Sequence, residues 1–147
     1  MCNELPADFI LPRPFETYKM VMPGILAVEV PKNIKHSDTP LIFEILQEAL
    51  KDAELDGLPL MVLCDDAAFT AQNLDNFVWV TFTRSNPSHD IYGINSFIEH
   101  KHWGCNGPLI IDARIKPHHA PVLEKDPEVE KLVNKMGEKG GALFGII

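Results

Sequence analysis

The sequence predicts an α/β fold of three layers, in which helices cover both faces of a mostly parallel sheet. A segment of strand character at 25–30 is followed by an amphipathic helix at 40–53. The continuously apolar segment 60–64 comes next, and such a segment is typical of a strand buried on both faces of a parallel sheet. A strand, a helix and a buried strand in this order indicate a βαβ unit, which belongs to layered α/β folds.

The composition argues against several classes of protein. The 147 residues fit one domain, and the apolar share of 46% is typical of a globular chain. The net charge of −8 opposes binding to nucleic acid or to anionic lipid. We expect no membrane span and no secretory signal, because no apolar stretch is long enough for either pattern. Three cysteines without paired spacing favour a reducing compartment, so we expect a cytoplasmic protein.

We divide the chain into an arm and a domain. Residues 1–21 contain three prolines and show no sustained periodicity, which predicts an extended, proline-rich arm. Residues 22–147 form the α/β domain, and its first strand, at 25–30, is β-branched and apolar.

The clearest helix follows this strand. Thr39 is a candidate cap and Pro40 suits the first helical position, where its missing N–H costs nothing. Gly57 is a candidate for the helix end. Apolar residues recur at steps of three and four, at Ile42, Ile45, Leu46, Ala49, Leu50 and Ala53.

The segment 73–84 fits two structures. Its β-branched and aromatic residues favour a strand by propensity. Leu74, Phe77, Val78, Thr81 and Phe82 also line one helical face, which Asn73 can cap. The resemblance described below favours the helix, and we predict a helix here.

Further elements are predicted in the second half of the chain. Segments 90–94 and 109–111 have strand character, and a loop rich in His, Trp and Gly lies between them. Asp126 as cap and Pro127 at the first position predict a last helix that ends at Gly137.

Four stretches, in this order, resemble the carboxy-terminal part of the UbiD family. They are the apolar strand with its aspartates at 60–66, the tryptophan-containing segment 76–84 that ends in Thr-Arg, the Pro-x-x-Asp turn at 86–90, and the segment 111–129. Their order and spacing make the set more specific than any single stretch. The chain departs from the family in having Asp-Asp-Ala in place of three acids, and Arg114 where many members have threonine.

The resemblance implies a function. UbiD enzymes reversibly decarboxylate aromatic or α,β-unsaturated acids with prenylated FMN and a divalent metal. Their cofactor cradle and catalytic Glu-Arg-Glu set lie in the amino-terminal part, which has no counterpart in this sequence. We therefore assign no catalytic residue to this chain and expect it to be inactive and free of tightly bound flavin by itself. The resemblance further implies a homo-oligomer, an amino-terminal UbiD-like domain or subunit as partner, and a small carboxylic acid as substrate.

The resemblance also places candidate site residues. Lys32 follows the first strand, about where the family has a lysine that reaches the prenylated flavin. The predicted loop lies where the family's carboxy-terminal domain covers the substrate, and its residues Phe97, Ile98, His100 and Trp103 are candidates for the pocket. An apolar wall there would exclude water and so favour loss of the carboxylate. Simple core packing of the aromatic residues is the alternative.

Three aspartates permit a second interpretation. Asp65 and Asp66 follow one predicted strand and Asp112 ends another, at the edge where open α/β sheets bind ligands. Carboxylates in this position are able to hold Mg²⁺. The structural alternative is that they cap a helix or pair with Arg84 or Arg114.

The densest set of potential zinc ligands lies in and after the predicted loop. It consists of His100, His102, Cys105, His118 and His119. The spacing matches no standard structural zinc pattern, so we assign no metal site, and loop packing is the alternative. Two functions of other classes remain open, namely a free-standing oligomerisation or binding module and a small metal-dependent enzyme.

Overall fold

The computed structural model describes residue 5 and residues 9–15, 17–53, 55–119 and 126–146. It contains two compact units, residues 1–117 and 118–147, and each is described by itself. Among the described helices, none is long and apolar enough to cross a membrane. The division into an arm of 1–21 and a domain of 22–147 stays a prediction.

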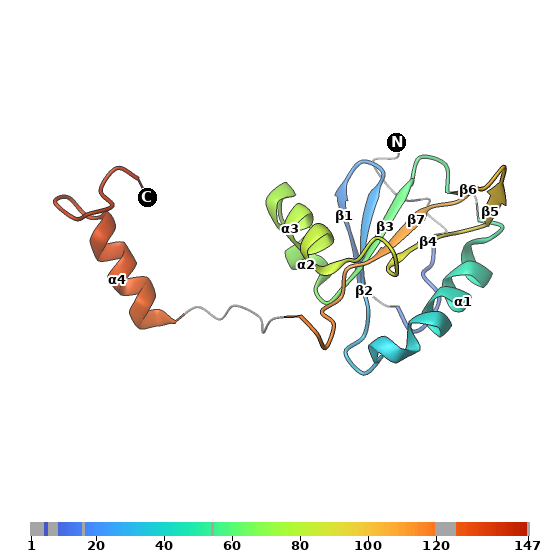
Figure 1. Ribbon diagram of the computed structural model, residues 1–147, viewed down its shortest axis with the longest axis horizontal. Coiled ribbons are helices and arrows are strands. Elements are labelled where there is room, and N and C mark those ends of the chain that lie inside the picture. The colour runs from blue at the N-terminus through green and yellow to red at the C-terminus, as the bar shows by residue number, and fades with distance from the viewer. Residues whose placement is uncertain (1–4, 6–8, 16, 54, 120–125, 147) are drawn as a thin grey trace. The chain divides into compact units, whose positions relative to one another are not determined.

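The first unit is built on a five-stranded mixed sheet (Figure 1). Its order is β1-β2-β3-β7-β4; the three central strands are parallel, and the two edge strands are antiparallel to their neighbours. The strands are β1 (Thr17–Met22), β2 (Ile25–Glu29), β3 (Leu60–Cys64), β7 (Leu109–Asp112) and β4 (Ile91–Gly93). The predicted α/β class is confirmed.

Helix α1 (Thr39–Leu50) packs on one face of the sheet and follows a short 3₁₀ turn, η1 (His36–Asp38). Its side chains at 42, 46 and 50 meet the large apolar residues of that face, Leu26, Val28, Met61, Leu63 and Ile110. The predicted helix is present, but its predicted ends are wrong. Thr39 is its first residue, and Gly57, with φ +84°, lies beyond its end.

Helices α2 (Ala67–Thr70) and α3 (Leu74–Arg84) cover the other face. Side chains alternate along each strand, so this face receives the residues that α1 does not. The residues packed there are mostly small: Ala27, Val62, Cys64, Ala67 and Ala113, together with Phe77 and Val80 of α3.

The ambiguous segment 73–84 is the predicted helix. The Asn73 side chain caps α3 by accepting a hydrogen bond from the Asn76 N–H at 2.8 Å. The predicted apolar face is only partly buried, because Phe77 is buried while Leu74 and Phe82 are exposed.

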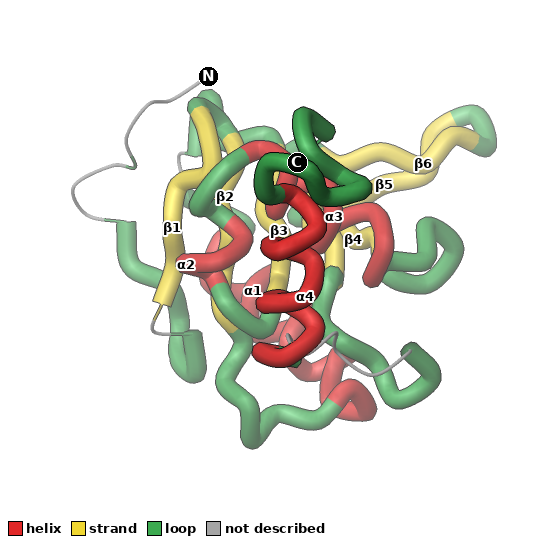
Figure 2. The backbone as a smooth tube through the Cα atoms, turned by 90° about the vertical axis from the view of Figure 1, so that its left-hand side faces the viewer, coloured by secondary structure: helices red, strands yellow, loops and turns green. Residues whose placement is uncertain are grey.

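Three antiparallel pairings were not predicted, and that of β4 with β7, together with that of β1 with β2, makes the sheet mixed and not mostly parallel. Strand β1 begins within the segment predicted to be an arm and ends one residue beyond it, and it pairs with β2 across a turn in which Gly24 has φ +84°. The predicted loop between β4 and β7 is wrong, because it contains a hairpin of β5 (Ser96–Glu99) and β6 (His102–Cys105). Figures 1 and 2 both show this hairpin extending outward from the body of the first unit.

The second unit contains helix α4 (Pro127–Gly137). As predicted, the Asp126 carboxylate caps it, and accepts hydrogen bonds from the N–H groups of Glu128 and Val129. Its apolar residues, Val129, Leu132, Val133 and Met136, are exposed.

Candidate functional site at the carboxyl edge of the sheet

The parallel strands β2, β3 and β7 end at one edge of the sheet. Leu63 of β3 pairs with Asp112 of β7, so Asp65 and Asp112 lie at the ends of neighbouring parallel strands, as predicted. Open α/β sheets bind ligands at this edge. What the side chains there contact therefore decides which chemistry the edge supports.

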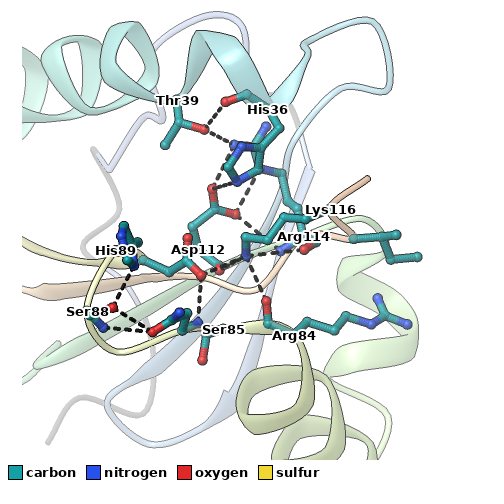
Figure 3. A network of polar contacts seen from close by, with 12 residues as sticks. His36, Thr39, Arg84, Ser85, Ser88, His89, Asp112, Arg114 and Lys116 are labelled. Atoms are coloured by element: carbon teal, nitrogen blue, oxygen red, sulfur yellow. Dashed lines mark hydrogen bonds and ion pairs between the residues drawn. The ribbon is translucent and has the colours of Figure 1, made fainter. Parts of the chain in front are cut away.

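Asp112 and Arg114 form a buried ion pair (Figure 3). Arg114 donates from Nε to Asp112 Oδ1 at 2.9 Å and from Nη2 to Oδ2 at 2.7 Å, and the side chains of Arg114 and Asp112 are 5% and 0% exposed. Nη2 also donates to Thr39 Oγ1 at 2.7 Å, which ties the end of β7 to the start of α1. Burial acts to raise the pKa of Asp112, but the Arg114 guanidinium outweighs it and holds that pKa below its ordinary value.

A second buried ion pair joins Lys116 to Asp90 at 3.1 Å. Lys116 Nζ also donates to the main-chain oxygens of Arg84 at 2.7 Å and Asp112 at 2.6 Å. Asp90 in turn accepts a hydrogen bond from the Asn86 N–H at 2.6 Å. The segment after β7 is thereby fixed to the end of α3 and to the turn that precedes β4.

The other two aspartates have structural roles. Asp66 caps α2 by accepting a hydrogen bond from the Phe69 N–H at 2.8 Å. Asp65 pairs with Arg84 at 3.3 Å and accepts a hydrogen bond from the Ile115 N–H at 2.7 Å. The alternative of capping and pairing is confirmed for Asp65, Asp66 and Asp112.

The geometry at this edge gives little support to a divalent cation. Ligand atoms of His36, Asp90 and Asp112 do lie within 4.8 Å of one another. However, Arg114 and Lys116 already balance the two buried carboxylates, so an added cation would meet two positive charges.

The potential zinc ligands of the first unit, His100, His102 and Cys105, do not form a cluster in the described structure. His100 lies at the turn of the hairpin, with φ +49°, and its ring is 3.7 Å from the Glu99 carboxylate. His102 begins β6 and Cys105 ends it, so they lie at opposite ends of one strand. His118 and His119 belong to the second unit, where their rings are 4.7 Å apart. Within the described residues, the grouping with metal-ligand geometry is instead the one at the carboxyl edge.

Of the four predicted pocket residues, Trp103 lines a cavity. The cavity has a volume of about 300 Å³ and its wall also contains Phe43 of α1 and Tyr92 of β4, whose rings stack with their centroids 3.4 Å apart. These two aromatic residues were not predicted; Phe43 lies beside the buried stripe of α1, which is a weak signal for a wall position. Burial raises the pKa of Tyr92, and the nearby Asp112 and Asp90 carboxylates act in the same direction.

The remaining predicted site residues are exposed. The Phe97 ring lies over Gly104, where an added Cβ would be 2.7 Å from it. Ile98 is 78% exposed, and His100 lies at the hairpin turn. Lys32 is an exposed residue of the turn after β2. Their roles in cofactor and substrate binding stay predictions.

Comparison with known proteins gives relatives among much longer chains. A protein of Chlamydia pneumoniae, described as one of the subunits of 4-hydroxybenzoate decarboxylase, is 31% identical over 107 residues, which are 73% of this chain and 18% of the relative. An uncharacterized protein of Chlamydia muridarum is 31% identical over 116 residues, which are 79% of this chain and 18% of that protein. The chain thus spans about a fifth of the length of these relatives.

Among solved structures, a decarboxylase aligns with this chain, at low sequence identity. The vanillic acid decarboxylase of Sedimentibacter hydroxybenzoicus in its open form aligns with a TM-score of 0.45 and 17% identity, over 76% of this chain and 26% of that one. No family model matches the chain. The resemblance predicted from the four stretches is nevertheless confirmed by the decarboxylase relative, and the chain belongs to the UbiD family, to whose carboxy-terminal part it corresponds.

Proposed function

We propose that this chain is the carboxy-terminal domain, or a split subunit, of a UbiD-type decarboxylase that uses prenylated FMN to act on aromatic or α,β-unsaturated acids. The observation that carries the proposal is the 31% identity to a 4-hydroxybenzoate decarboxylase polypeptide over 73% of the chain. The rest of such an enzyme supplies the catalytic residues, and the assembly is cytoplasmic. The predicted three-layer αβα arrangement of the family's carboxy-terminal domain is part of this proposal.

The β5–β6 hairpin is the proposed lid. An isolated two-stranded hairpin has little stability in water, so the exposed side chains of Phe97, Ile98 and Trp103 call for a covering surface. In the complete enzyme, these side chains close over the substrate and His100 adjusts the polarity of the pocket. An apolar cover excludes water and destabilises the substrate carboxylate relative to the more dispersed charge of the transition state.

This chain fits the cofactor at one point. Lys32 is exposed after β2, at the same edge as the other strand ends, and its ammonium group suits a flavin phosphate. No glycine-rich loop follows β3, where Asp65 and Asp66 are engaged in pairing and capping. The flavin cradle and the divalent metal therefore belong to the partner, and prenylated FMN supplies there the electron sink for decarboxylation.

A patch on α2 and α3, the outer α3 face, is the proposed assembly contact. It consists of exposed apolar residues, namely Phe69, Leu74, Val78, Trp79 and Phe82. Leu74, Val78 and Phe82 recur every four residues and so form one stripe along the helix. Exposed apolar stripes of this kind mark protein interfaces, which fits contact with a second copy or with the catalytic portion.

Complementation tests the proposal. The chain is co-expressed with the C. pneumoniae relative from which the matched 107 residues have been removed, prenylated FMN is supplied, and CO₂ release from 4-hydroxybenzoate is measured. Neither piece alone should be active, and the two together should associate and release CO₂. Failure to associate contradicts the proposal.

The outer α3 face supports one other function, a non-catalytic assembly module. Association without any turnover, with self-association seen by light scattering, would favour that module. Phe82→Glu should weaken association in both cases, whereas Glu48→Gln on α1, at the other face of the sheet, is the matched control.

A further inference from the structure

The cavity under Trp103 combines aromatic rings with one carboxylate. Phe43 and Tyr92 stack at an interplanar angle of 17°, and the Trp103 ring closes a further side. Gly93 permits this approach, because an added Cβ would lie 3.1 Å from Trp103 Cη2. The cavity is thus an aromatic slot between α1, β4 and β6.

The charge around this slot has one sign. Glu44 is the charged residue in its wall, and no Lys, Arg or His contributes to the lining among the residues that the structure describes. Glu44 is exposed and forms no ion pair with any residue that the structure describes. Gln47 is held in two hydrogen bonds with Asn95, at 2.8 and 2.9 Å, and completes a neutral polar rim.

Such a lining favours positive charge. The faces of aromatic rings carry negative potential and attract ammonium and guanidinium groups. An unpaired carboxylate at the rim adds to this attraction and repels anions. The volume of about 300 Å³ lies at the lower end of the range for small-molecule sites.

We propose that this slot binds an organic cation, an alkylammonium or guanidinium group, between Trp103 and the stacked pair Phe43 and Tyr92, with Glu44 as counter-ion. The proposal rests on the geometry of this chain and does not require the decarboxylase function. It concerns the side of Trp103 that faces α1 and β4, whereas the proposed lid also has the exposed side chains of Phe97 and Ile98, which do not line this cavity.

NMR titration of the full chain with choline tests the proposal. The chain has two tryptophans, so the indole N–H signal of Trp103 reports on the slot and that of Trp79 is an internal control. Choline should shift the Trp103 signal alone. The neutral isostere of choline, in which a tert-butyl group replaces the trimethylammonium group, should bind about tenfold more weakly. A second titration compares N-acetylarginine amide with its neutral citrulline analogue. Stronger binding of the arginine compound than of choline would show that the slot prefers a guanidinium group to an alkylammonium group.

Matched variants locate the site. Trp103→Leu should abolish the binding of choline, followed at backbone signals of β4, whereas Trp79→Leu should not change it. Glu44→Gln should weaken binding by about threefold to tenfold. Glu48→Gln, one turn further along α1 where Glu48 pairs with Lys51, should leave it unchanged.

Three outcomes overturn the proposal. One is equal affinity for choline and its neutral isostere, which would define a merely apolar slot. Another is no shift of the Trp103 signal at choline concentrations that saturate a site of millimolar affinity. The third is a shift of that signal by 4-hydroxybenzoate and not by choline, which would instead support the predicted acid pocket.

Discussion

Replacing Arg114 with methionine removes one partner of the buried ion pair and keeps most of the side-chain volume. The Asp112 carboxylate, which is 0% exposed, loses the two charged hydrogen bonds of 2.9 and 2.7 Å and keeps the Arg114 main-chain N–H at 3.2 Å. Breaking a buried pair in this way typically costs about 3–5 kcal/mol. We expect about 3 kcal/mol, the low end, because Lys116 remains beside Asp112.

The size of this loss depends on pH. In the native protein the pKa of Asp112 lies below its ordinary value of 3.8, so the ion pair stabilises the fold above that pH and its contribution is lost as the pH falls through the folded pKa. In Arg114→Met the effect of burial is no longer outweighed, and the pKa of Asp112 rises. The difference in unfolding free energy between the two proteins should therefore be largest at neutral pH and shrink as the pH falls, vanishing only below the lowered folded pKa of Asp112.

Urea unfolding at several pH values measures this difference, with circular dichroism as the signal. At neutral pH the melting temperature should fall by about 6–12 °C for a chain of this length. Lys131→Met is the control, since its surface pair with Glu128 contributes about 0–1 kcal/mol. A loss below about 1 kcal/mol for Arg114→Met, or a loss independent of pH, would refute the reasoning.

Three further changes test local features. Asn73→Ala removes the cap of α3 and should lower the unfolding free energy by about 1 kcal/mol in urea titrations; an unchanged value would mean that the cap is dispensable. Gly93→Ala places a Cβ 2.4 Å from the Cys105 Cβ, so it should displace the hairpin and lower the unfolding free energy by about 1–3 kcal/mol. Unchanged NMR signals of β6 would contradict this. Burial raises the pKa of Cys64 to about 11 and also raises that of the less buried Cys105, so iodoacetamide at about pH 8 should label Cys105 before Cys64, as measured by peptide mass mapping; equal labelling of the two would show that β3 opens.

The centre of the fold could be predicted because its signals are local. The apolar segment 60–64 and the periodic apolar positions of α1 each carry the pattern of one element. The caps Asn73 and Asp126 mark helix starts by side-chain chemistry that acts over two or three residues. The placement of Asp65 and Asp112 followed from strand direction alone.

The edges of the sheet carry weaker signals. A Pro-Gly pair such as Pro23-Gly24 is typical of turns, but pairing of β1 with β2 also needs a partner strand that local pattern does not identify. In the hairpin, His100 and Lys101 have φ values of +49° and +69°. Non-glycine residues seldom adopt such values, and the common Asn-Gly or Asp-Gly signal is absent there.

The polar network depends on contacts between distant segments. Lys116 meets Asp90 because β4 and β7 are neighbours, and Phe43 meets Tyr92 because α1 packs near the edge strand. No spacing in the sequence encodes either contact. The pairing of Asp112 was readable as an alternative because Arg114 is close to it in sequence, whereas the pair of Asp65 with Arg84 joins more distant residues.

The unequal side-chain sizes on the two faces of the sheet imply opposite tolerances to mutation. On the α2 and α3 side, alanines at 27 and 113 leave no spare space, so a larger residue would force α3 outward and pull Arg84 away from Asp65. On the α1 side, truncation of a residue such as Leu46 would leave a void. The fold should thus tolerate few substitutions to larger side chains on the face covered by α2 and α3, and few substitutions to smaller ones on the face covered by α1.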